Sequence, residues 1–158
     1  MKIKMILVNP KKHNRIWVNL PTANGILSET LKQIIGPDRD NFLVKLYSTK
    51  FYIDIPIDST NIWEVNDKLK MLNMCATDRE IIALSEAYSK NLDEILAKVK
   101  SGAYEFYPRL TLKKLAESCK CKRPYQHYPT EQILDYMCKL GFIETSTGII
   151  KINNEEKQ

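Results

Sequence analysis

Three helix starts follow one another in the middle of the chain, and they constrain the fold more than any other feature of the sequence. Each start pairs an Asn or Thr with a Glu three positions later: Asn61 with Glu64, Thr77 with Glu80, and Asn91 with Glu94. The first side chain can cap the N–H groups of the opening turn, while the acid reaches back and favours the positive helix end. Apolar residues then recur at helical spacing until Gly102, a typical stop residue. Residues 59–103 are therefore predicted to form a bundle of three short, antiparallel helices.

The segments on either side of this bundle mix strands and helices. In residues 1–58, the runs "KIKMILV", "IWVNL", "NFLVKLYS" and "FYIDIP" are typical of strands, and "ILSETLKQIIG" has a helical apolar face. In residues 104–158, two amphipathic helices, "LTLKKLAESCK" and "TEQILDYMCKLG", precede a closing hairpin, "FIETSTGIIKI". The predicted fold class is α+β. We expect an elongated chain with a ββαββ subdomain over 1–58, the helical bundle, and a C-terminal α/β subdomain ending in a β-hairpin.

A cluster of rigid residues separates the bundle from the last subdomain. Its members are Tyr104, Phe106, Tyr107 and Pro108. Proline fixes the backbone direction, and the next helix is expected to be capped by Thr111. We interpret the cluster as a joint whose aromatic rings wedge between two subdomains.

The composition is that of a soluble globular protein, with 44% hydrophobic and 27% charged residues among 158. No run approaches the roughly 18 apolar residues of a membrane helix, and the apolar core of the first residues is too short for a signal peptide. We therefore expect a cytoplasmic protein that does not bind membranes.

The chain carries no recognisable catalytic constellation. It has two histidines, neither beside a nucleophile signature, and its five glycines are scattered rather than gathered in a phosphate-binding loop. Cys119, Cys121, His127 and Cys138 could be assembled into a metal site on paper, but the C-x-C spacing is not that of a zinc knuckle. The alternative is that the cysteines are small, reduced, buried residues. We expect no enzyme activity, no metal and no cofactor.

The net charge of +5 is unevenly distributed. Residues 1–58 carry nine Lys/Arg against five Asp/Glu, residues 59–108 six against eight, and residues 109–158 nine against six. The predicted bundle holds a row of acids that could imitate the phosphates of a duplex, although Lys and Arg in the same segment nearly neutralise it. The row is Glu64, Asp67, Asp78, Glu80, Glu86, Asp93 and Glu94.

The opposite charge gathers near the C-terminal end. The basic residues are Lys113, Lys114, Lys120, Lys122 and Arg123, and they precede Tyr125, His127 and Tyr128. Cations beside aromatic rings are typical of surfaces that follow phosphates and stack on bases. The alternative is an ordinary solvated helix face followed by a loop whose tyrosines pack over a core edge.

Four runs of the sequence resemble the ArdA-like antirestriction family, in that family's order. "IWVNLPTANGILSETLKQIIG" is similar to a strand ending in "LP" followed by a helix ending near "IG", and "IWEVNDKLKMLNM" to a helix of the form "i-x-E-L-N-x-L". "LDEILAKVKSGAYEFYP" resembles the family's "Y-x-f-Y-p" joint, and "GFIETSTGIIKI" its closing hairpin. Together the four runs cover most of the chain.

The resemblance implies a non-enzymatic, dimeric protein of conjugative transposons, plasmids or phages. Members of the family are elongated, mimic bent DNA and occupy the DNA-binding channel of type I restriction-modification enzymes. This chain departs from the family in charge, because it is basic and carries cations where acids are expected in the last subdomain. We therefore expect a host restriction-modification or other defence nuclease as partner, a homodimer, and either DNA mimicry or a different mode of contact. A small module that binds nucleic acid through residues 113–128 is the alternative.

Overall fold

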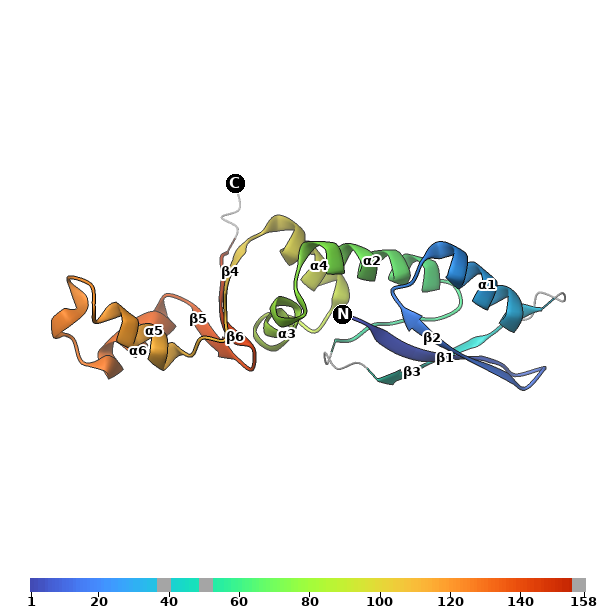
Figure 1. The fold of residues 1–158 in the computed structure, drawn as a ribbon, viewed down its shortest axis with the longest axis horizontal. Helices are drawn as coiled ribbons and strands as arrows, with labels where there is room; N and C mark the ends of the chain where they lie inside the picture. The colour runs from blue at the N-terminus through green and yellow to red at the C-terminus, as the bar shows by residue number, and fades with distance from the viewer. Residues whose placement is uncertain (37–40, 49–52, 155–158) are drawn as a thin grey trace. The chain divides into compact units, whose positions relative to one another are not determined.

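The structure, a computed structural model, describes residues 1–36, 41–48 and 53–154 (Figure 1). It is a mixed α+β fold, with six α-helices and two antiparallel three-stranded sheets in the described residues. The chain divides into two compact units, residues 1–75 and 76–158. Each unit contains one of the two sheets.

The first unit is built on a sheet with strand order β2-β1-β3. Its strands are β1 (Ile3–Asn9), β2 (Asn14–Leu20) and β3 (Leu43–Ser48). Along β1, apolar residues at alternate positions are buried, as the sequence pattern predicts. Helix α1 (Asn24–Ile35) contributes Leu27, Leu31 and Ile34 to the core, and α2 (Ile62–Cys75) completes the unit.

Buried asparagines join the elements of the first unit. Asn66 of α2 is fully buried: its Oδ1 accepts from the N–H of Thr22 (2.9 Å) and its Nδ2 donates to the carbonyl of Thr22 (3.0 Å). Asn9 is also fully buried, and its Nδ2 donates to the carbonyl of Ile34 (2.9 Å) at the end of α1. Because each amide satisfies backbone groups of another element, both asparagines fix how strands and helices meet.

The second unit places helices beside a sheet with strand order β4-β6-β5. Its helices are α3 (Asp78–Ala87), α4 (Leu92–Ser101), α5 (Leu112–Cys119) and α6 (Thr130–Lys139). Its strands are β4 (Tyr104–Pro108), β5 (Phe142–Thr145) and β6 (Gly148–Ile152). The predicted closing hairpin is confirmed, with Thr145 opposite Gly148.

Two of the three predicted helix caps are confirmed. Thr77 and Glu80 form a complete capping box, and Asn91 accepts from N–H groups of the first turn of α4. The prediction for Asn61 and Glu64 is wrong. The Asp58 carboxylate accepts from Thr60 and from the N–H of Asn61, so Asn61 Oδ1 turns back to accept from the N–H of Asp58 (2.7 Å).

The aromatic joint is a strand in the structure. Its four residues lie in β4, at the edge of the sheet, and Tyr107 pairs with Ile149 of β6. Phe106 is half-buried and Pro108 is exposed. The alternating side chains of residues 104–108 are typical of a strand, and the edge of β6 is available to pair with them. These residues therefore form a strand, although the Gly that precedes them and the Pro at their end predicted an irregular segment.

One further strand prediction needs correction, and the division into units can be compared with the predicted subdomains. The run 53–56 contains only an isolated bridge at Asp54 instead of a strand, and the first residues of that predicted strand, 51–52, lie outside the described residues. The boundary between the units falls inside the predicted bundle, so α2 belongs to the first unit, while α3 and α4 belong to the second. The division into three subdomains stays a prediction. Within the described residues, no helix is both long and apolar enough to cross a bilayer.

Candidate functional site

Helices α5 and α6 and the loop between them form a lobe with its own small core; we call residues 111–140 the α5–α6 lobe. Ala116, Ile133 and Met137 are buried at its centre. Tyr125 and Phe142 pack against this core among other partly buried side chains. Thr111 caps α5 as predicted, accepting from the N–H of Lys114 (3.2 Å). The lobe therefore has a fixed scaffold beneath its surface loop.

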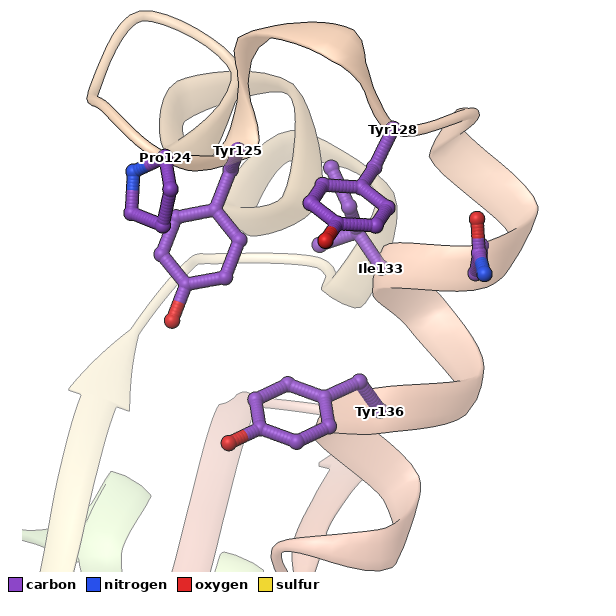
Figure 2. A pocket seen from close by; sticks show the side chains of 6 residues that line it. Pro124, Tyr125, Tyr128, Ile133 and Tyr136 are labelled. Atoms are coloured by element: carbon purple, nitrogen blue, oxygen red, sulfur yellow. The ribbon is translucent and has the colours of Figure 1, made fainter.

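An open pocket of about 260 Å³ lies between this loop and α6 (Figure 2). It is lined by Pro124, Tyr125, Tyr128, Gln132, Ile133 and Tyr136. Figure 2 shows the rings of Tyr125 and Tyr128 entering from the loop and the ring of Tyr136 entering from α6. Tyr128 is 47% exposed and Tyr136 is 50% exposed, so two aromatic faces remain open to a ligand.

Successive turns hold the loop tyrosines in place. The N–H of Tyr125 donates to the carbonyl of Lys122 (2.9 Å), and the N–H of Tyr128 donates to the carbonyl of Tyr125 (3.2 Å). The two rings lie 6.5 Å apart between centroids and are tilted by 52°. This is an ordinary distance for a contacting aromatic pair, so the two rings form a single wall of the pocket.

The predicted cations all precede the loop tyrosines in sequence. Lys113 and Lys114 lie on α5, and Lys120, Lys122 and Arg123 follow it; all are exposed except Lys120, which is half-buried. In the described part of the chain, none of the five forms an ion pair or a side-chain hydrogen bond. The lobe thus combines unpaired positive charge with open aromatic faces.

The predicted acidic row is divided between the two units. Glu64 and Asp67 lie on α2 in the first unit and form ion pairs with Lys68 (2.6 Å) and Lys70 (3.6 Å). The remaining acids lie on α3 and α4 in the second unit: Asp78, Glu80, Glu86, Asp93 and Glu94. The structure therefore does not place all seven carboxylates on one surface of one unit.

Several of these acids have local partners. Glu80 closes the capping box of α3, and Glu86 accepts from the N–H (2.7 Å) and hydroxyl (2.5 Å) of Ser146 in the closing hairpin turn. Asp93 and Glu94 lie in the first turn of α4, where their charge favours the positive helix end. Both are exposed and remain accessible to a basic partner.

Strand β4 and its neighbours have a fixed local geometry. The Tyr107 hydroxyl donates to Glu105 Oε2 (2.7 Å), and this hydrogen bond raises the pKa of Tyr107 above its ordinary value. Gly148 has a φ of +155°, and a Cβ there would overlap the carbonyl oxygen of Tyr107. Only glycine therefore allows β6 to approach the end of β4 this closely.

The sequence prediction missed the half of the pocket that α6 contributes. Gln132 and Tyr136 are four positions apart, so the sequence places them on one helix face, but that spacing alone does not indicate a pocket. The cysteine interpretation was wrong at three positions, because Cys75, Cys121 and Cys138 are exposed. Cys119 is half-buried beside the lobe core. Within the described ranges, no group of three or more His, Cys, Asp or Glu side chains is placed to hold a metal ion.

Comparison of the sequence with models of known families and with curated proteins gives no match. The resemblance to the ArdA-like family therefore stays a prediction, and it rests on the four sequence runs alone.

Proposed function

We propose that this chain is a non-enzymatic counter-defence protein of a mobile element. It acts in the cytoplasm as a homodimer without a cofactor. It binds a host restriction-modification enzyme, or a related defence nuclease, and thereby inhibits cleavage of incoming DNA.

The observation that carries this proposal is that the four family-like runs meet in pairs. In the first unit, the run 16–36 is joined to the run 62–74 by the two hydrogen bonds between Thr22 and Asn66. Thr22 follows the "LP" of the first run, and Asn66 is the Asn of the second. A buried amide that satisfies both backbone groups of one residue is a specific folding contact.

The second unit pairs the other two runs in the same way. Strand β4, from the "YEFYP" end of run 92–108, is hydrogen-bonded along its length to β6, from run 141–152. Gly148 of the closing hairpin lies against the backbone of Tyr107 and Pro108, where a side chain would not fit. The residues that carry the resemblance are therefore also residues that hold each unit together.

The exposed acids of α4 are candidate contacts for a basic DNA-binding groove. Such grooves bind largely through phosphate charge, which carboxylates can imitate. The test is cleavage of unmodified plasmid by a purified type I enzyme in the presence of the protein, at several DNA concentrations. Inhibition that excess DNA relieves supports binding in the DNA channel.

A charge-reversal pair separates mimicry from other modes of contact. Asp93→Lys with Glu94→Lys should weaken inhibition, while Glu29→Lys, an exposed acid of α1 outside the row, should leave it unchanged. Equal inhibition by all variants would reject the acids of α4 as the contact. No inhibition of type I, II or III enzymes at large molar excess would reject the proposed function itself.

The α5–α6 lobe supports a second candidate function, the direct binding of nucleic acid. The observation in its favour is that five unpaired cations and the open tyrosine rings belong to the same small lobe. Lys120→Glu, Lys122→Glu and Arg123→Glu together should weaken binding in a gel shift and reduce its salt dependence, because each lost phosphate contact lowers the salt slope by about one. No shift of DNA or RNA by the wild-type protein at low salt would exclude this candidate.

A further inference from the structure

We infer that the tyrosine pocket of the α5–α6 lobe takes one unstacked base of a single-stranded nucleic acid, whose phosphates lie along the cationic loop. This inference rests on the second candidate function and names the form of nucleic acid and the residues that contact it.

The size and walls of the pocket fit a single flat ring system. Its volume of about 260 Å³ is below the roughly 300–1,000 Å³ of pockets that enclose larger ligands. Tyr125 and Tyr128 contact each other, so a base cannot be inserted between them. The open faces are those of Tyr128 and Tyr136, on opposite sides of the pocket (Figure 2). A base that enters therefore stacks on one or both of these rings.

The pocket also offers free hydrogen-bonding groups to the edge of a base. Gln132 lines the pocket, and its side-chain amide makes no hydrogen bond among the described residues. An amide presents both a donor and an acceptor, and the hydroxyl groups of Tyr128 and Tyr136 are likewise unbonded in the described part of the chain. Such polar groups in an aromatic pocket orient a bound base, and they do not exclude any of the four bases.

The distribution of charge indicates on which side of the pocket the phosphates of the bound strand lie. Lys122 and Arg123 immediately precede Pro124, the first residue that lines the pocket. Glu131 and Asp135 are exposed on α6, beside the pocket residues Gln132 and Tyr136. Because carboxylates repel phosphates, the backbone of the bound strand runs along the loop side, and α6 contacts the base.

The same geometry favours single strands over duplexes. In a duplex each base is stacked on its neighbours and paired, and it must leave the stack before an aromatic pocket can receive it. A single strand presents its bases without that cost, and stacking on protein rings tolerates any sequence. The cations alone would bind both forms, so the tyrosines are what distinguishes them.

The experiment measures fluorescence anisotropy with a labelled oligothymidine of about 16 nucleotides and with a labelled duplex of mixed sequence. The variants are Tyr136→Ala and Tyr128→Ala, with Tyr136→Trp to restore a stacking surface. Tyr88→Ala is the matched control, because Tyr88 is a 43% exposed tyrosine outside the lobe. Circular dichroism of each variant establishes that it is folded.

We expect Tyr136→Ala, Tyr128→Ala or both to weaken binding of the single strand about 5- to 150-fold, the range for loss of one stacked base. Tyr136→Trp should recover most of that loss, and Tyr88→Ala should have no effect. The duplex should bind more weakly than the single strand and be unaffected by the tyrosine substitutions, while the Lys120→Glu, Lys122→Glu and Arg123→Glu variant should weaken binding of both forms.

Three results would overturn the inference: unchanged affinity in both alanine variants, equal loss for single strand and duplex, or tighter binding of the duplex. In each of these cases the protein still binds nucleic acid, and it is the pocket assignment that fails. If neither oligonucleotide nor a single-stranded RNA of the same length binds at low salt, both the inference and the second candidate function are rejected, and the tyrosine surface remains available for contact with a protein.

Discussion

Replacing Asn66 by alanine tests the contact that joins the first two family-like runs. The change removes both hydrogen bonds to Thr22 and empties the space of a fully buried amide. Each hydrogen bond contributes about 1 kcal/mol net, and a buried group left without its partner adds to that cost. Thr22 is only half-buried, so water can reach part of its freed backbone. We therefore expect a loss of about 2–3 kcal/mol in the free energy of unfolding of the first unit.

The two tryptophans make this measurement specific. Trp17 and Trp63 are the only tryptophans of the chain, and both lie in the first unit. Thermal unfolding followed by tryptophan fluorescence therefore reports the unit that contains Asn66. For a unit of this size, the expected loss corresponds to a fall of about 10–20 °C in the midpoint.

Asn19→Ala is the matched control, because Asn19 is exposed on β2 and makes no side-chain hydrogen bond among the described residues. Its midpoint should stay close to that of the wild type. If Asn66→Ala and Asn19→Ala have the same midpoint, the contact with Thr22 does not stabilise the unit. The hydrogen bonds between Thr22 and Asn66 would then not be a stabilising link between the first two runs.

Three further predictions concern the second unit. Gly148→Ala should destabilise the second unit by more than about 1 kcal/mol in a circular dichroism melt, because the backbone at this position has a positive φ and the new methyl group would overlap the backbone of β4. Gly25→Ala is the control: its Cβ would meet open space and its φ is not positive, so it should be neutral or slightly stabilising. Phe106→Ala should cost about 2 kcal/mol in urea unfolding, less than a fully buried ring would, and an unchanged midpoint would place the ring in solvent. The pKa of Tyr107 is raised by its hydrogen bond to Glu105, so the folded state favours the protonated phenol. The stability advantage of the wild type over Tyr107→Phe should therefore be present below pH of about 10 and shrink as the pH rises further. An advantage that grows at alkaline pH in unfolding titrations would contradict that sign.

Local signals in the sequence were sufficient to predict where most helices begin and end. The capping box of Thr77 and Glu80 and the stop at Gly102 are determined within a few residues, and both are confirmed. The cap at Asn61 was mispredicted because a competing acceptor, Asp58, lies three positions earlier in the loop. Propensity cannot decide between two such acceptors, since the choice depends on the path of the loop.

Contacts between distant segments were harder to predict. Residues 104–108 form a strand because β6, more than forty positions later, offers a pairing edge. The pocket depends on the loop after α5 meeting one face of α6, so the tyrosine of the helix had no local signature of function. The basic residues and the loop tyrosines were recognised because they are neighbours in the sequence. Closeness in sequence was misleading for the acidic row, because its members belong to two different units.

The most direct test of the central proposal is the plating efficiency of unmodified phage on restricting cells that express the protein. We predict that expression raises plating towards the level of a non-restricting strain, and that the empty vector does not. Plating that stays at the restricted level for type I, II and III hosts, with the folded protein present in the cells, would contradict the proposal that this chain is a counter-defence protein.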